Sequence, residues 1–317
     1  MDTSNGLRDT MSRFFQFLWL AAAIVSGMLG GTAQAAEESG GHGLDQAAPQ
    51  LFSLPLPGGI ELPVSNSMLM LFLAVLFISL VVWLATRAMK ILTSRFQTMV
   101  EYFFEHLYHF VESLLGPRLT RKYFWYFGTI FTIILVSNYM GLLPGVGTIT
   151  YHGVPLFRGA NADLNVTMFL GLFYAVMWLY WSIREQGLKH FFLHLFGPKG
   201  GMKGFMGAVL VPIFIFVGIV ECLSIAIRPI ALAARLFGNI YAGEPIIETM
   251  SHMFGPLGSA LCVLPFLAIE LLVGFIQALV FLLLTAIFLK LQIGDEDSQR
   301  HDTPPESLPE PGAGNKP

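Results

Sequence analysis

Charged residues inside long apolar stretches are the side chains of this sequence best placed to do chemistry. An ion in the hydrocarbon of a membrane costs at least about 2.5–3.5 kcal/mol, so such residues are usually functional or paired. Three of them are spaced by seven residues, which places them on nearly one face of a helix. The complete set of these charges is Glu221, Arg228, Arg235, Glu244, Glu248 and Glu270, of which the first three have that spacing.

Amide and carboxyl side chains accompany these charges at helical spacing. Glu270 and Gln277 share one helix face, and Asn239 extends the stripe that contains Arg235. Carboxyl and amide groups at two depths of a membrane can relay protons, and a permanent cation between them blocks direct leakage. Arginine suits the blocking role because its guanidinium stays charged where a lysine could lose its proton. The alternative is that Arg235 pairs with Glu244 or Glu270 and only holds two helices together.

The composition indicates the setting in which these residues lie. Of the 317 residues, 54% are hydrophobic and 12% are charged, whereas a soluble domain carries roughly 25% charged residues. This excludes a soluble enzyme, a disordered chain and a basic nucleic-acid-binding protein. Both cysteines, Cys222 and Cys262, lie in apolar stretches, which excludes a disulfide-rich scaffold or a zinc framework. The fold class predicted is therefore an all-α polytopic membrane protein.

Five apolar stretches are long enough to cross a membrane. The last two would be roughly 69 and 50 Å long as straight helices, and the hydrocarbon is only about 30 Å thick, so both must be tilted or kinked. After the first stretch, apolar residues recur at i, i+3 and i+4 over 95–115, which predicts an amphipathic helix at the membrane interface. The five stretches are residues 68–85, 123–143, 164–183, 205–250 and 257–289.

The N-terminus has the pattern of a secretory signal peptide over residues 1–35. Arg8 and Arg13 precede an apolar run, and Ala33-Gln34-Ala35 has the form of a cleavage site. The alternative is an uncleaved first helix. An external segment over 36–66 then precedes the membrane domain, 67–292, and a tail rich in Pro, Asp, Glu and Gly, 293–317, is expected to be disordered and cytoplasmic.

Lys and Arg are distributed unevenly among the connecting loops. The loops that follow the first and third stretches are rich in both residues, whereas the loop after residue 143 holds only Arg158. Because cytoplasmic loops carry the excess of Lys and Arg, this predicts an external N-terminus and a cytoplasmic C-terminus.

Several motifs together resemble one known family. The run Arg-Leu-Phe-Gly-Asn-Ile-Tyr-Ala-Gly-Glu over 235–244 resembles the central motif of subunit a of the F-type ATP synthase, and the resemblance continues upstream through Glu221, Ser224 and Arg228-Pro229. The stretches 137–144 and 162–167 look like the family's two earlier signatures. Gln277 stands in the position of the family's last-helix glutamine, and the similarity covers roughly residues 66–292.

This resemblance implies the stator of a rotary motor, with two offset half-channels that carry protons to and from the carboxylates of a ring of c subunits. Ion flow would thereby be coupled to ring rotation and ATP synthesis. Arg235 would face the ring carboxylate and separate the half-channels. Glu221 would belong to the cytoplasmic half-channel. The external half-channel would be lined by Asn239, Glu244, Glu270 and Gln277, with Asp163 and Asn165 near its mouth.

The resemblance also implies the setting and the partners. The chain would be a non-catalytic, multi-pass subunit of the bacterial plasma (inner) membrane, with the ATP chemistry in other subunits. Its partners would be the c-ring, b-type peripheral stalk subunits, the other ATP synthase subunits and membrane lipid. We expect no nucleic acid, cofactor or metal. Many bacterial members have histidine at the position of Glu270. Here Glu244 and Glu270 are both acidic and would not easily ionise together, which leaves open how they share protons.

Two other classes of protein also place charges in the membrane. A secondary transporter would show two similar halves with paired broken helices, and the sequence has no such repeat. A purely structural scaffold would tolerate loss of Arg235 and the carboxylates.

Overall fold

The computed structural model describes residues 50–56, 60–86, 95–143, 146, 149–151, 154–187, 205–253 and 256–301. The predicted signal peptide, the first part of the predicted external segment and the last part of the predicted tail lie outside these residues.

Five helices of the described chain are long and apolar enough to cross a membrane. This confirms the predicted all-α polytopic fold class, and the helices overlap all five predicted stretches. Two of them are far longer than a bilayer crossing requires, as expected. The five are α2 (Asn66–Thr86), α4 (Pro117–Gly141), α5 (Leu164–Gln186), α7 (Phe205–Met253) and α8 (Pro256–His301).

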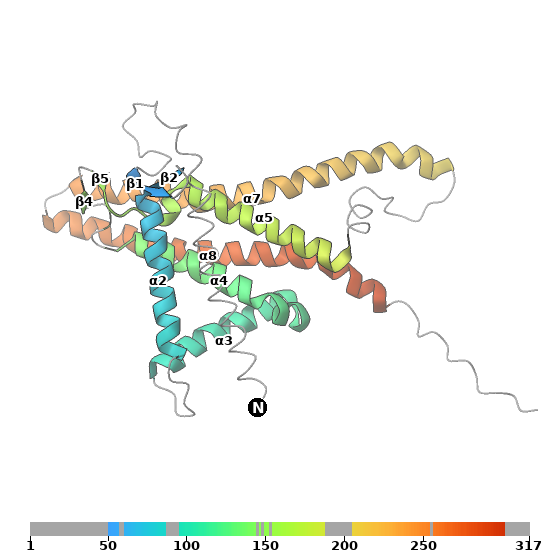
Figure 1. Cartoon of the computed structure of the whole chain (residues 1–317), viewed down its shortest axis with the longest axis horizontal. Helices are drawn as coiled ribbons and strands as arrows, with labels where there is room; N and C mark the ends of the chain where they lie inside the picture. Colours follow the sequence, from blue (N-terminus) through green and yellow to red (C-terminus); the bar gives the residue numbers. More distant parts are fainter. Residues whose placement is uncertain are drawn as a thin grey trace, which may run out of the picture.

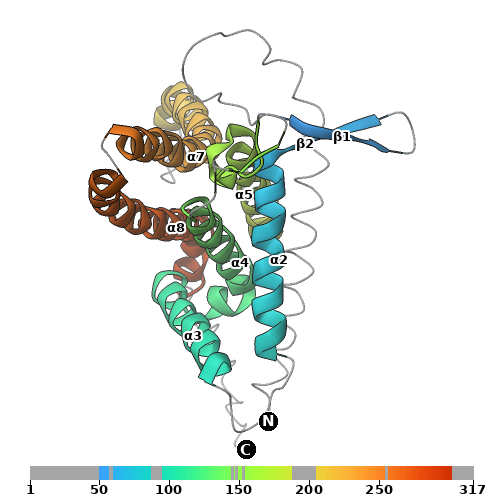
Figure 2. The ribbon, with the colours of Figure 1, turned by 90° about the vertical axis from the view of Figure 1, so that its left-hand side faces the viewer.

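The long helices lie across the direction of the first one. Figure 1 shows α7 and α8 along the longest axis of the molecule, with α2 crosswise to them. Viewed from the end, α7 and α8 occupy one side, α2 the other, and α4 and α5 lie between (Figure 2). A 21-residue helix such as α2 fits an upright crossing, so α7 and α8 are steeply tilted. Prolines lie inside both long helices, at Pro212, Pro229, Pro245 and Pro265.

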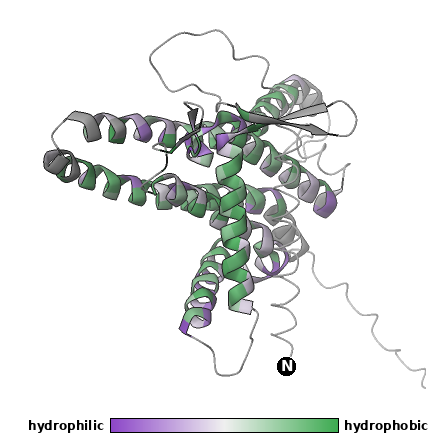
Figure 3. Ribbon diagram, turned by 60° about the vertical axis from the view of Figure 1, so that its left-hand side comes forward, coloured by the Kyte–Doolittle hydropathy of each residue, from purple (hydrophilic) through white to green (hydrophobic). Residues whose placement is uncertain are grey.

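Most of the surface of the first spanning helix is apolar, as its largely green colouring in Figure 3 shows. One side of α2 packs on the bundle through residues such as Ala74 and Val75. The other exposes large apolar side chains, among them Phe72 and Phe77. Such a helix is suited to lipid on its outer side.

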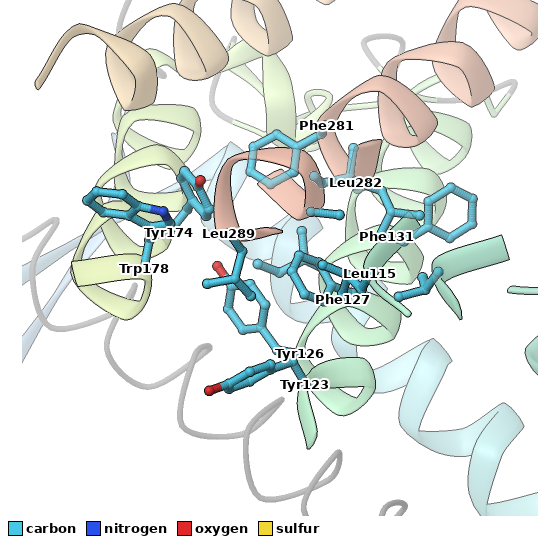
Figure 4. Close-up of a cluster of buried hydrophobic side chains, with 14 of the residues drawn as sticks. Leu115, Tyr123, Tyr126, Phe127, Phe131, Tyr174, Trp178, Phe281, Leu282 and Leu289 are labelled. Atoms are coloured by element: carbon cyan, nitrogen blue, oxygen red, sulfur yellow. The ribbon is translucent and has the colours of Figure 1, made fainter. Parts of the chain in front are cut away.

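The predicted amphipathic helix is α3 (Arg95–Leu115). It packs against α4 and α8 through Leu107, Val111 and Leu115. This apolar seam continues into the main core, where α3, α4, α5 and α8 meet around Tyr126 and Phe281 (Figure 4). The core therefore holds α8 in place against the upright part of the molecule.

Helices α5 and α7 approach each other closely at one glycine. An ideal Cβ at Gly171 would lie 2.5 Å from the carbonyl oxygen of Pro229 and 3.3 Å from the Cβ of Ala233. Only glycine allows the backbone of α5 to come this near to α7.

The structure contains short elements that the sequence interpretation did not include. Strands β1 (Gln50–Leu56) and β2 (Ile60–Ser65) form an antiparallel hairpin in the predicted external segment. Its signal in the sequence is Pro57-Gly58-Gly59, a turn-forming run between two short apolar segments. After α4 come β4 (Thr150–Tyr151), β5 (Val154–Pro155) and a single 3-10 turn, η3 (Ala160–Ala162).

Helix α8 ends later than the composition indicates. It continues to His301, so the first part of the segment expected to be disordered, from residue 293, is helical. Each further residue adds a backbone hydrogen bond to an existing helix without a new nucleation cost.

Candidate functional site

The start of α5 brings Asp163 and Asn165 to the end of the loop that follows α4. Asp163 is the N-cap of α5, and its Oδ1 accepts a 2.9 Å hydrogen bond from the backbone N–H of Asn165. This is the usual use of an aspartate at a helix start. Burial raises the pKa of the Asp163 carboxyl, while the Asn165 N–H and the nearby Arg158 act in the opposite direction. The predicted channel mouth is therefore a buried acidic cap.

An arginine from the same loop reaches the central motif of α7. The side chain of Arg158 is buried, and its Nε lies 3.7 Å from Oε2 of Glu244. Glu244 is only partly exposed. This ion pair joins the loop between α4 and α5 to the C-terminal part of the long helix α7.

The second carboxyl of the predicted pair comes from α8. The Glu270 carboxyl rests against the backbone of Gly243, and an ideal Cβ at Gly243 would lie only 2.6 Å from Cδ of Glu270. Glu244 is the next residue, and the two carboxyl groups interact electrostatically. The structure thus brings Glu244 and Glu270 together at the contact between α7 and α8.

A short chain of buried amides adjoins this acidic pair. Asn138 of α4 donates from Nδ2 to the carbonyl oxygen of Gly274 at 3.0 Å and accepts from Nδ2 of Asn161 at 2.7 Å. Gly274 leaves room for this contact, since its ideal Cβ would lie 3.2 Å from that of Asn138. Gly274 lies one turn after Glu270, so the amides continue from the acidic pair into the α4–α8 interface.

Arg235 lies on the exposed side of α7. Leu232 and Leu236 are buried against the bundle, whereas Arg235 points away from it. Within the described part of the chain it has no hydrogen bond or ion pair, so the alternative in which it pairs with Glu244 or Glu270 has no support.

The remaining predicted residues are spread along the two long helices. Asn239 is half-buried, one turn after Arg235, and Gln277 is buried on α8. Glu221 is half-buried and lies about 35 Å before Glu244 along α7. The predicted residues therefore form one acidic cluster and one distant carboxylate, with Arg235 between them in the chain.

Three residues of this arrangement are absent from the sequence prediction. Arg158 is the only Lys or Arg in its loop. It is thus an exception to the uneven charge distribution among the loops, and this exception could have drawn attention to it. Asn138 belongs to the stretch 137–144, which the sequence already singles out. Asn161 carries no signal of its own, because only the folded loop brings it beside Asn138.

Comparison with known proteins agrees with the sequence motifs. A sequence model of the ATP synthase A chain family matches residues 68–290. The chain is 31% identical over 226 residues to ATP synthase subunit a of Protochlamydia amoebophila, covering 69% of this chain and 77% of that protein. It is 32% identical over 250 residues to subunit a of Gluconacetobacter diazotrophicus, covering 74% and 92%. It is 28% identical over 254 residues to "ATP synthase subunit a, sodium ion specific" of Propionigenium modestum, covering 78% and 80%. The chain therefore belongs to the family of ATP synthase a subunits.

Proposed function

We propose that this subunit is the stator of a rotary F-type ATP synthase and carries protons to and from a ring of c subunits through two offset half-channels. Arg235 separates the half-channels. The observation that carries this proposal is the layout of α7. An acidic cluster lies beyond Arg235, the carboxylate of Glu221 lies before it, and Arg235 itself is on the exposed side.

The surface of α7 supports a partner at this position. In the apolar segment of α7 only 11% of the residues are buried, compared with 61% in the corresponding segment of α4. Around Arg235 the exposed face consists of small residues at helical spacing, which lets another helix come close. We call this face the small-residue stripe, and its members are Ala231, Ala234, Gly238 and Ala242 together with Arg235. A c-subunit helix fits this stripe, and its carboxylate would meet the guanidinium.

The proton path follows from the same layout. Protons enter from the external side past Asp163 and Asn165, move through the part of the half-channel lined by Glu244 and Glu270, and pass Asn239 and Gln277 to the ring carboxylate. Glu221 serves the cytoplasmic half-channel. Arg235 favours the ionised ring carboxylate and prevents a proton from passing directly between the half-channels.

The assembly and the location complete the proposal. The N-terminus is external, the C-terminus is cytoplasmic, and the membrane is the bacterial inner membrane. The subunit does no ATP chemistry itself. Besides the c-ring and lipid, its partners are b-type peripheral stalk subunits and the catalytic part of the enzyme.

Replacement of Arg235 tests this function. In the assembled enzyme, reconstituted in liposomes, Arg235→Ala should abolish ATP synthesis driven by a proton gradient, because the ring carboxylate loses its cation and the half-channels lose their barrier. The measurement is ATP formed after an acid–base jump in sodium-free medium.

The matched control is Arg228→Gln on the same helix. Arg228 lies 4.3 Å from the ring centroid of Phe288 and packs against α8, outside the proposed path. This variant should retain synthesis. Normal synthesis by Arg235→Ala would contradict the proposed function.

A further inference from the structure

Arg158 is a buried cation outside the family motifs on which the proposed function rests. It lies between β5 and η3, and its side chain is 7% exposed. A guanidinium remains charged at any physiological pH, so a buried one needs an anion beside it. Its Nε lies 3.7 Å from Oε2 of Glu244, which supplies that anion.

The backbone that carries Arg158 is held firmly against two helices. At the next residue, Gly159, an ideal Cβ would lie 3.4 Å from Cγ2 of Ile240 on α7. An ideal Cβ at Gly141, the last residue of α4, would lie 3.2 Å from Cα of Gly159. The loop is thus enclosed between α4 and α7, next to the turn of α7 that runs from Ile240 to Glu244.

Titratable and charged groups face this position from each neighbouring element. Asp163 comes from the cap of α5, Glu244 from α7 and Glu270 from α8. Helix α4 contributes the amide of Asn138 and the phenol of Tyr139, which pack at Gly274. Arg158 thus interacts electrostatically with Asp163 and forms an ion pair with Glu244, and Glu270 in turn interacts electrostatically with Glu244.

We infer that Arg158 is a positioning residue that holds Glu244 as a permanent carboxylate and leaves Glu270 as the carboxyl that exchanges protons. The Arg158–Glu244 pair is neutral as a whole, so Glu270 can be protonated and deprotonated beside it. Glu270 accepts a proton from external water and releases it toward the ring carboxylate, while Arg158 and Glu244 keep their charges. This assignment rests on the proposed function and explains how two adjacent glutamates share one task.

The test measures proton-driven ATP synthesis by the assembled enzyme in liposomes as a function of pH on the external side. Arg158→Gln should slow synthesis by about tenfold or more, because it removes a buried cation from beside the partly buried Glu244 carboxylate. It should also move the midpoint of the pH dependence upward, since loss of a cation makes the neighbouring carboxyls bind protons more tightly. Arg158→Lys keeps the charge and should keep the midpoint.

Changes at Glu244 should move the midpoint in the opposite direction and should also reverse the effect of Arg158→Gln. Glu244→Gln removes the negative charge that acts on Glu270 and should move the midpoint downward. The double variant Arg158→Gln/Glu244→Gln leaves no net charge there, as in the native pair, and its midpoint should return toward the native value. Arg184→Gln, which removes an exposed arginine from the other end of α5, is the matched control and should leave the profile unchanged.

A role for Arg158 in folding alone would lower the rate at every pH without moving the midpoint. That result, or a double variant that stays shifted, would overturn the inference. The proposed function would still stand if Arg235→Ala abolished synthesis in the same preparation. If Arg158→Gln does not assemble, the downward shift in Glu244→Gln decides the matter, and its absence would also overturn the inference.

Discussion

At position 243 the backbone leaves no room for a side chain. The Glu270 carboxyl occupies the place where a Cβ would lie, 2.6 Å from its Cδ. Gly243→Ala must therefore displace Glu270 from Glu244. We expect proton-driven synthesis to fall by about tenfold or more, because misplacing a reacting group by about 1 Å can cost roughly 100-fold in rate. The measurement is the rate of ATP synthesis by the reconstituted enzyme.

Two further variants show that space at this contact is the cause. Glu270→Asp shortens the side chain by one methylene, so it should partly restore synthesis in the Gly243→Ala background. Gly128→Ala is the control, because its Cβ would meet Phe124 at 3.5 Å, an ordinary contact. A Gly243→Ala enzyme with native activity would show that Glu270 does not need this position.

Between elements, Asn138 links α4 to α8 and to the loop that contains η3. Asn138→Ala removes the bonds to Gly274 and Asn161 from a buried interface, which should cost about 1–3 kcal/mol of stability. Thermal unfolding of the purified complex measures the loss. Thr132→Val is the control, since the Thr132 hydroxyl bonds only within α4, to the carbonyl of Gly128. Equal melting temperatures for the two variants would contradict the linking role.

The elements themselves could be predicted from the sequence, because apolar runs and helical periodicity are local patterns. The amphipathic segment 95–115 and the membrane crossings α2 and α5 could be predicted from these local patterns alone. The ion pair of Arg158 with Glu244 could not be predicted, since it joins positions far apart in the chain and depends on how the loop packs on α7. The contact of Glu270 with Gly243 likewise depends on how α7 and α8 pair.

At the scale of the whole molecule, the small-residue stripe is a surface that the described part of the chain leaves uncovered. Nothing lies within 4 Å of an ideal Cβ at Gly238, so Gly238→Leu should not disturb the fold. It should instead block a helix that packs on the stripe, and co-purification of c subunits should fall sharply. Cys222→Leu is the control, because Cys222 is also exposed on α7 but lies roughly 160° around the helix axis from Gly238. Undiminished c-subunit recovery with Gly238→Leu would place the ring elsewhere.

The close approach of Gly171 to Pro229 has a mechanical consequence for such an assembly. A rotating ring would push α7 sideways, and α7 has little buried surface with which to resist. Near the middle of α7, backbone meets backbone at this glycine with no flexible side chain between them. A sideways force on α7 would therefore be transmitted to α5 with little deformation, and from α5 to the core around Tyr126 and Phe281. A stator needs this stiffness if torque is to reach the ring instead of bending its own helix.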